Sequence, residues 1–216
     1  HIIIWTTTPW TIPANRALAY GNKIKYSVIK IGKDTKYFQN KKIIVATELI
    51  KMVSEECNFK DFTVLKEFNG NDFKNTVCQH PFLNLGYNYD VPMLEGDFVT
   101  LEQGTGVVHA APSHGPDDFN LCLKHGLKAP DTMNDAGIYS EAIPFFSGIH
   151  IFKADPVVIE KLSESKSLLG NGKLQHSFPH SWRSKAPLVY RATPQWFISM
   201  EKNNLRKKAL KAIDNT

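Results

Sequence analysis

The segment WTTTPWTIPAN, which runs from Trp5 to Asn15, places four threonines and two prolines within eleven residues. The β-branched run Ile2–Thr8 that leads into it predicts a strand, and Pro9 and Pro13 end that strand because proline donates no ladder hydrogen bond. Backbone groups released from strand pairing can face a ligand, and threonine hydroxyls both donate and accept, which suits holding a water molecule beside an ester. The alternative is a threonine-rich strand end with no ligand, since threonine is common in strands.

A second segment, GTGVVHAAPSHGPDDF from Gly104 to Phe119, joins a strand to a helix. Its apolar part, Gly106–Ala111, predicts a strand that delivers His109 to a loop broken by proline and glycine. A proline and two aspartates then predict a helix over Gly115–His125. The dipole of that helix favours an ionised carboxylate at Asp118, which we expect to be exposed and able to bind an ammonium group. The alternative is that the two aspartates only cap the helix.

Outward from these segments, short strand-like runs recur along the chain with a few helical patterns between them. The strand-like runs are Lys25–Ile31, Lys42–Val45, Phe62–Phe68 and Phe98–Leu101, with two further extended runs at Leu188–Ala192 and Trp196–Met200. The helical patterns are Ala46–Cys57, Ala154–Leu162 and the basic, amphipathic Glu201–Ile213. Many short strands with few helices predict a β-rich α+β fold, with a barrel as one arrangement of the strands.

Composition bounds the class of protein. A hydrophobic fraction of 42% in 216 residues permits a core of useful size, and the net charge of +5 permits an anionic partner, although a lysine-rich surface explains it equally well. Three cysteines, Cys57, Cys78 and Cys122, lie far apart without CxxC spacing, which fits a reducing cytosol. No run approaches the ~20 apolar residues of a membrane span, and the start of the chain has neither a signal peptide nor a methionine. We therefore expect a cytoplasmic protein and read the chain as a piece of something larger.

Several common catalytic motifs are missing from the sequence. It contains no GxxxxGK[ST] or GxGxxG phosphate loop, no HExxH and no GxSxG. The histidine pairs His109 with His114 and His176 with His180 have no further ligands at metal spacing, so we expect no metal site.

Three blocks of the sequence resemble the editing domain, an insertion called CP1, of bacterial-type isoleucyl-tRNA synthetases. They are Trp5–Asn15, Gly104–Phe119 and His176–Met200, and together they span nearly the whole chain. The last of the three resembles the return segment that leads back into that family's catalytic domain. Relatives for leucine and valine typically carry TTRPxT and a PAHDxxD-type loop, whereas this chain has TTTPWT and APSHGPDD, and its IPAN favours the bacterial type. The chain departs from the family at three positions, with Ser181 in place of a frequent cysteine and Phe178 and Phe119 in place of frequent tyrosines.

The resemblance implies a hydrolytic proofreading domain that removes valine from isoleucine tRNA. It implies a barrel-like editing domain with peripheral helices over residues 1–200, and a basic helix over 201–216 that begins the return into the catalytic domain. The ATP-site signatures HIGH and KMSKS are absent, so the chain itself should neither use ATP nor charge tRNA, and editing should need no cofactor. The implied partners are the acceptor end of tRNA(Ile) carrying valine and the rest of the synthetase, with a monomeric protein and no membrane.

The resemblance also implies a role for each site residue. A pocket that activates amino acids discriminates between side chains that differ by one methylene by only about 1–3 kcal/mol, and isoleucyl-tRNA synthetase is itself the standard example of this limit. The remedy is a second site that hydrolyses the smaller, wrong product. Asp118 would bind the ammonium group, and His109 would act as a steric wall in preference to a general base. The residues expected to hold the ribose, the ester and the water are Thr6, Thr7 and Thr8. Of these, Thr7 and Thr8 are expected to act in catalysis together with Asp118. The residues expected to shape the side-chain pocket are Trp10, Thr11, His109 and, from behind, Asn15.

Two other functions stay open at this point. A free-standing aminoacyl-tRNA deacylase would carry the same site residues, and the length of the native reading frame would separate it from a synthetase domain. A basic RNA-binding module without catalysis would need Asp118 and the threonines to be structural.

Overall fold

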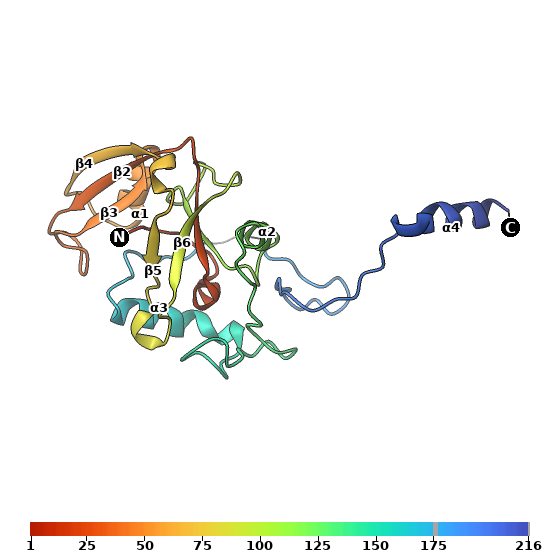
Figure 1. Ribbon diagram of the computed structural model, residues 1–216. Helices are drawn as coiled ribbons and strands as arrows, with labels where there is room; N and C mark the ends of the chain where they lie inside the picture. Colours follow the sequence, from red (N-terminus) through yellow and green to blue (C-terminus); the bar gives the residue numbers. More distant parts are fainter. Residues whose placement is uncertain (175–176, 216) are drawn as a thin grey trace.

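The computed structural model describes residues 1–174 and 177–215, and its strands form two sheets (Figure 1). The four-stranded sheet has the order β5-β6-β1-β7, with β1 parallel to β6 and the other pairs antiparallel. The three-stranded sheet has the antiparallel order β3-β2-β4. The strands are β1 (Ala17–Tyr20), β2 (Lys25–Ile31), β3 (Lys42–Ala46), β4 (Phe62–Asn69), β5 (Val77–Gln79), β6 (Asp90–Glu95) and β7 (Val107–Ala110).

The two sheets share the larger apolar core, and Tyr26 joins them. The phenol of Tyr26 on β2 accepts a hydrogen bond from the Gly21 N–H at 3.0 Å and donates to the Gly106 carbonyl at 2.7 Å. Gly106 has φ of 75°, and a Cβ there would lie 2.4 Å from the Cβ of Ala46, so the turn into β7 accepts only glycine. Gly106 of the GTG sequence therefore serves the close approach of the two sheets, whereas a Cβ on Gly104 would meet only the Trp5 side chain, at 3.7 Å.

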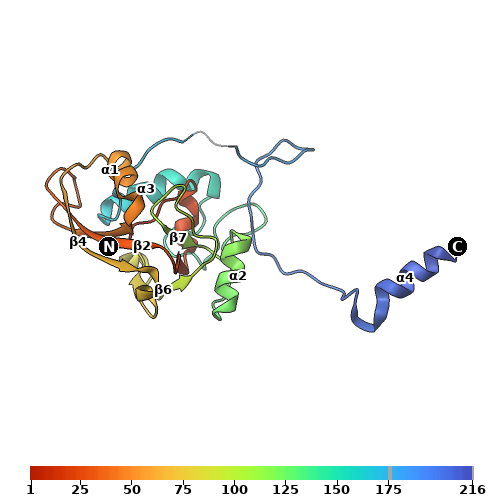
Figure 2. The same ribbon diagram turned by 90° about the horizontal axis from the view of Figure 1, so that it is seen from above.

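A second apolar cluster lies beneath the four-stranded sheet, where α3 (Ala154–Glu164) packs on the 3₁₀-helix η1 (Pro9–Ala14) (Figure 1). Buried aromatic side chains fill the space between them, among them Tyr87, Tyr139 and Phe146. The two remaining helices near the sheets are α1 (Ile50–Glu56), which follows a 3₁₀ turn, and α2 (Pro116–Lys124), which follows β7 and stands apart from α1 and α3 in the second view (Figure 2).

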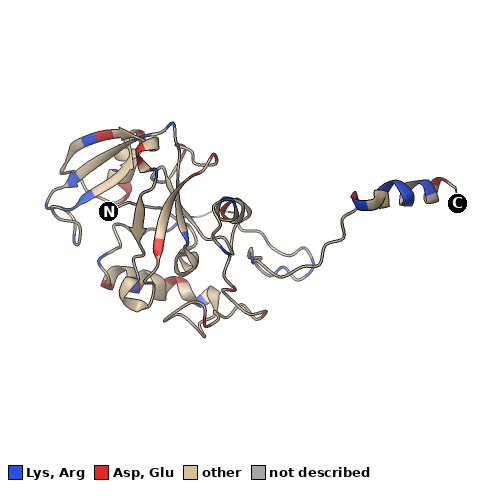
Figure 3. Ribbon diagram, in the orientation of Figure 1, with Lys and Arg blue, Asp and Glu red and all other residues tan. Residues whose placement is uncertain are grey.

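The C-terminal part of the chain extends away from the sheets and ends in α4 (Leu205–Asp214) (Figures 1 and 2). The predicted helix is confirmed, and lysine and arginine residues recur along it (Figure 3). All of its described residues are exposed, including the apolar Leu205, Leu210 and Ile213. The proposed boundary at residue 200 stays a prediction. Among residues 1–174 and 177–215, no helix is both long and apolar enough to cross a bilayer.

The class prediction, a sheet-rich α+β fold, is confirmed, but several elements differ from expectation. The predicted strand Ile2–Thr8 is wrong, because only Ile2 forms a bridge, to Ile44, and beyond it the Thr8 N–H bonds back to the Thr6 hydroxyl and turns the chain. Phe98–Leu101 is not a strand either. The extended runs at 188–192 and 196–200 pair with no strand of the described chain. Closure of the two sheets into a barrel stays a prediction.

The sequence missed three strands, β1, β5 and β6. The β1 sequence ALAY has no β-branched residue, β5 has only three residues, and β6 contains Pro92. Packing against neighbouring strands therefore forms these elements without a strong local preference. The predicted helix at Ala46–Cys57 also starts later than expected, at Ile50.

Candidate functional site

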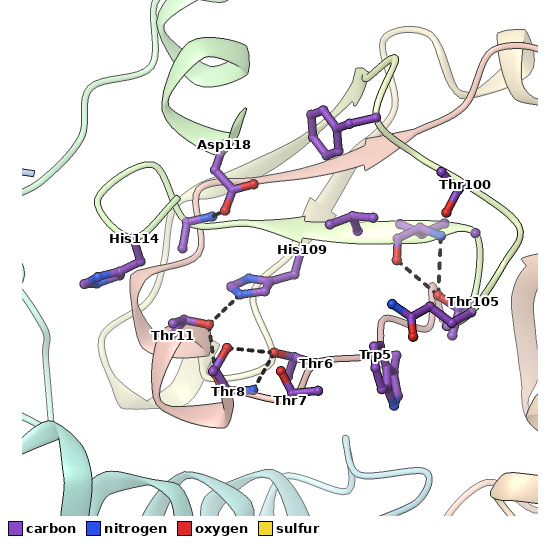
Figure 4. A pocket seen from close by; sticks show the side chains of 17 residues that line it. Trp5, Thr6, Thr7, Thr8, Thr11, Thr100, Thr105, His109, His114 and Asp118 are labelled. Carbon is purple, nitrogen blue, oxygen red and sulfur yellow. Dashed lines mark hydrogen bonds between the residues drawn. The ribbon is translucent and has the colours of Figure 1, made fainter. Parts of the chain in front are cut away.

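A cavity of about 390 Å³ lies between β7 and the segment that precedes η1 (Figure 4). Six of the eight predicted site residues line it: Thr6, Thr7, Thr8, Thr11, His109 and Asp118. The other lining residues are Trp5, Phe98, Thr100, Gln103, Gly104, Thr105, Gly106, Val107, Val108, Ala111 and His114. The pairing of β1 with β7 explains this convergence, because it places Leu18 opposite His109 and so brings the end of η1 beside the histidine.

The three consecutive threonines form one wall of the cavity (Figure 4). The Thr6 hydroxyl accepts a hydrogen bond from the Thr8 N–H at 3.0 Å and lies 3.3 Å from the Thr8 hydroxyl. Thr7, between them, is exposed. Pro9 then starts η1. The three hydroxyls therefore lie directly before this helix, on a stretch of backbone that pairs with no strand.

His109 is held by a chain of three hydrogen bonds. The Asn15 side-chain amide lies 2.9 Å from His109 Nδ1, and His109 Nε2 lies 2.8 Å from the Thr11 hydroxyl. The Thr11 hydroxyl donates its own hydrogen to the Thr8 carbonyl at 2.9 Å, so it must accept from His109 Nε2–H. Nδ1 is then the acceptor for the amide hydrogen of Asn15. The bonds thus select the neutral imidazole with its proton on Nε2.

The electrostatics of His109 agree with that neutral form. Burial, with smaller contributions from the nearby His80 and His114, lowers the pKa of His109 to about 4. Neither ring nitrogen offers a free lone pair to the cavity, because both are bonded to the protein. The geometry therefore favours the steric role for this side chain over the general-base role.

Asp118 lies in the first turn of α2 and points its carboxylate toward the cavity (Figure 4). It is half-buried, not exposed as expected. Burial raises the pKa of Asp118 to about 6, while a hydrogen bond from the Ala111 N–H to Oδ2 at 2.9 Å opposes this rise and the neighbouring Asp117 adds to it. We expected the helix dipole to lower the pKa of Asp118, but burial outweighs the dipole and raises the pKa. The carboxylate is still mostly ionised above pH 7.

Trp10 and Asn15 are predicted site residues that do not line the cavity. Trp10 is buried in the second apolar cluster, where its ring meets that of His114 edge-on at 4.8 Å. Asn15 lies behind His109 and is buried, with its amide also donating to the Ala17 carbonyl at 2.9 Å. Its position behind the histidine is compatible with the expected role of shaping the pocket, which stays a prediction. A direct contact of Trp10 with substrate stays a prediction.

His114 lines the cavity but was not predicted as a site residue. Its Nδ1 donates to the Tyr190 carbonyl at 3.1 Å, burial lowers its pKa to about 4, and its Nε2 is buried without a hydrogen-bond partner. A neighbouring bond, from the Ala192 N–H to the Ser113 carbonyl at 2.9 Å, joins the same two segments. The loop between β7 and α2 is therefore held by the chain near residue 190.

The other end of the cavity is lined by residues that the sequence did not indicate, chiefly Trp5, Phe98 and Gln103. The Trp5 side chain is 38% exposed, which is high for an indole and leaves one side open to the cavity. The position of Trp5 directly before the three threonines was the one feature of the sequence that could have indicated its place in the cavity.

Metal-ligating side chains do not cluster in the described part of the chain. Among residues 1–174 and 177–215, no three or more His, Cys, Asp or Glu side chains are grouped so that they could hold an ion. Of the histidine pairs, His109 and His114 have the partners given above, and His176 lies outside the described residues.

The sequence is similar to known proteins over its full length. No protein-family profile matches the chain. It is 64% identical over 215 residues to the isoleucine–tRNA ligase of Pelagibacter ubique and 46% identical over 228 residues to that of Gluconobacter oxydans. The alignments cover 100% and 99% of the chain but 24% of each relative, so the chain spans about a quarter of the length of the curated relatives it matches.

Two solved structures share the fold. The crystal structure of GlLeuRS-CP1 has a TM-score of 0.62 at 14% identity, and the similarity covers 81% of this chain and 84% of that one. The editing domain of the P. falciparum cytosolic leucyl-tRNA synthetase has a TM-score of 0.52 at 11% identity, over 75% of each chain. At these identities the likeness shows the fold alone, and it confirms the predicted CP1 type of fold.

Proposed function

We propose that this chain, which belongs to the isoleucine–tRNA ligases and has the fold of CP1 editing domains, hydrolyses the ester bond of wrongly charged tRNA. The substrate is valine esterified to the terminal ribose of tRNA(Ile). The observation that carries the proposal is the placement of the Asp118 carboxylate and the Thr6–Thr8 hydroxyls around one cavity, with the His109 ring in its wall (Figure 4).

Asp118 recognises the ammonium group of the aminoacyl ester. Its carboxylate is half-buried, and an ion pair formed away from bulk water is stronger than one at the surface. The Ala111 N–H fixes Oδ2 and orients the carboxylate before substrate arrives. Burial without a cation raises the pKa of Asp118, and an ammonium group in the cavity would lower it again, so binding and ionisation support each other.

The threonines place the ester and the attacking water. The water oxygen forms a bond to the ester carbonyl carbon, the bond from that carbon to the ribose oxygen breaks, and a water proton ends on the ribose hydroxyl. The products are free valine and uncharged tRNA, and no covalent intermediate is needed because an ester requires only a positioned water and stabilisation of the developing charge. Thr7 is exposed to the cavity and Thr8 is bonded to Thr6, so their hydroxyls serve this positioning.

His109 sets the selectivity. Bonds to Asn15 and Thr11 fix its ring on both edges, so the ring cannot rotate away from a larger substrate. A surplus methylene in such a packed site costs roughly 1–3 kcal/mol in strain. The isoleucyl ester, which is the correct product, is thereby spared, and the valyl ester is cleaved.

The partners follow from the same proposal. The acceptor end of tRNA(Ile) is the bound nucleic acid, and α4 carries one arginine and three lysines against a single aspartate (Figure 3). ATP serves the catalytic part of the synthetase and not this reaction. The domain works as a monomer in the cytoplasm, attached to the rest of the synthetase.

A deacylation assay tests this function. The chain should release valine from valyl-tRNA(Ile), and Asp118→Ala should remove most of that activity. Asp117→Ala is the matched control, because Asp117 lies in the same helical turn but is exposed and outside the cavity lining. Binding of the tRNA without any release of valine would point to the RNA-binding module instead.

A further inference from the structure

Helix η1 begins without the cap that its sequence offers. Thr8 occupies the N-cap position, where a threonine hydroxyl ordinarily accepts a hydrogen bond from a backbone N–H of the first turn. No such bond is present, and the Thr8 hydroxyl lies beside that of Thr6 and lines the cavity. Something else must therefore satisfy the first free N–H of η1, which belongs to Trp10, since Pro9 has none.

Asp155 supplies that acceptor from a distant element. Its Oδ1 accepts from the Trp10 N–H at 2.8 Å across 145 residues of sequence. Asp155 is the second residue of α3, which packs on η1. The Tyr139 phenol donates to the Trp10 carbonyl, so the backbone groups of Trp10 are held on both sides.

We propose that Asp155 is a positioning residue for the hydrolysis, which caps η1 at Trp10 and so leaves the Thr8 hydroxyl at the cavity. This inference rests on the proposed function, because it assigns Asp155 a part in that reaction. Asp155 does not line the cavity and touches no reacting atom. Its effect passes through Thr8.

Removal of Asp155 leaves the part-buried Trp10 N–H without its acceptor, which is unfavourable. The nearest remedy is local, because rotation of the Thr8 hydroxyl to the first turn of η1 restores an ordinary N-cap. That rotation withdraws the hydroxyl from the cavity. A displacement of about 1 Å in a positioning group can lower a rate by on the order of 10²-fold.

The activity experiment compares three variants in the deacylation of valyl-tRNA(Ile). Asp155→Ala should lower kcat by roughly 10- to 100-fold with little change in KM. Asp155→Asn keeps an acceptor oxygen at the same place and should restore most of kcat. Glu160→Ala, an exposed carboxylate on the same helix, is the control and should behave like the wild type.

Two further measurements separate positioning from general structural damage. In a Thr8→Val background, Asp155→Ala should cause little additional loss, because residues that act through one group give non-additive effects. In NMR spectra of the labelled chain, the Trp10 amide resonance should shift as acid protonates Asp155, and this titration should vanish in Asp155→Asn. The Thr8 methyl resonance should move in Asp155→Ala and stay in Glu160→Ala.

The outcomes distinguish the two proposals. A wild-type chain that fails to deacylate valyl-tRNA(Ile) overturns the proposed function. An active wild type with an equally active Asp155→Ala, or with additive losses in the Thr8→Val background, overturns only the role of Asp155. If Asp155→Ala fails to fold, a folded Asp155→Asn that has lost its kcat contradicts the capping role just as clearly.

Discussion

The side-chain amide of Asn15 donates to Nδ1 of His109 across 2.9 Å. This bond places the histidine proton on Nε2, and the Thr11 hydroxyl accepts the hydrogen bond from Nε2–H. The ring is thereby fixed in its neutral form, which favours the proposed role of a steric wall over that of a general base. The distinction is testable, because a wall and a base respond differently when the ring is removed.

His109→Ala should broaden the substrate range. Loss of the ring opens space for one more methylene, so the variant should begin to hydrolyse isoleucyl-tRNA(Ile) while it still cleaves valyl-tRNA(Ile). Removal of a barrier of roughly 1–3 kcal/mol corresponds to a gain of about 5- to 150-fold on the isoleucyl ester. Time courses with the two charged tRNAs measure this. Parallel loss of both activities would instead indicate a chemical role for the imidazole.

Asp118→Asn should inactivate the domain and stabilise its fold at neutral pH. The pKa of Asp118 is about 6 in the folded chain, above the usual 3.8, so the folded state disfavours the ionised form. Ionisation therefore lowers stability as the pH rises from about 4 to 6, and a permanently neutral side chain avoids this loss. We expect a gain on the order of 1–2 kcal/mol at pH 7.5, after allowance for partial exposure.

Thermal melts at pH 7.5 and pH 3.5 check the sign of this effect. The difference between Asp118→Asn and the wild type should disappear at the lower pH, where both side chains are neutral. A variant that melts below the wild type at pH 7.5 would show that the helix dipole and the Ala111 N–H outweigh burial.

The fold should lose stability in mild acid. Burial lowers the pKa of His80, His109 and His114 to about 4 each, below the usual 6.5. Between these values the unfolded chain binds more protons, so stability is full above pH 6.5 and falls as the pH decreases. Asp118 opposes this trend, because its raised pKa lets the folded chain bind one proton before the unfolded chain does. The net loss in the free energy of unfolding from pH 6.5 to 5 should be on the order of 2–4 kcal/mol. Urea unfolding at several pH values measures it, and a flat profile would contradict burial as the cause.

Hydrolysis should not depend on a bound metal ion. The histidines at the cavity are bonded to protein groups, and the expected chemistry needs only a carboxylate and hydroxyls. Chelator-treated protein should keep its activity when the magnesium that folds the tRNA is controlled separately. Activity that is lost and then returns with zinc alone would refute this.

Much of the site could be predicted because its residues lie in two short segments of unusual composition. The threonines and His109 come together through the pairing of β1 with β7, yet β1 itself was missed because ALAY carries no strong strand preference. Six of the eight predicted residues share the cavity in spite of this. Local composition thus made the two segments stand out, while the resemblance to the editing-domain family implied the role of each residue, and neither revealed the sheet that joins them.

What the sequence could not provide were effects that depend on packing. The burial of Asp118 reverses the expected direction of its pKa shift, and no local pattern reports how much protein covers a helix terminus. The tautomer of His109 follows from a bond to Asn15, 94 residues away. Asp155 lies in the first turn of its own helix, as aspartates commonly do, and its partner is a backbone N–H that is 145 residues away in the sequence.

Because the bond between Trp10 and Asp155 spans 145 residues of sequence, we expect it to form late during protein synthesis. A ribosome that has released the threonines and even the His109 strand still holds a nascent chain whose η1 lacks its cap, because residue 155 has not emerged. Closing so long a loop comes late, as contacts of high sequence separation do. We expect the cavity to gain its final shape only once α3 has left the exit tunnel, so that a half-made chain hydrolyses the charged tRNAs around the translating ribosome more slowly than the finished chain does.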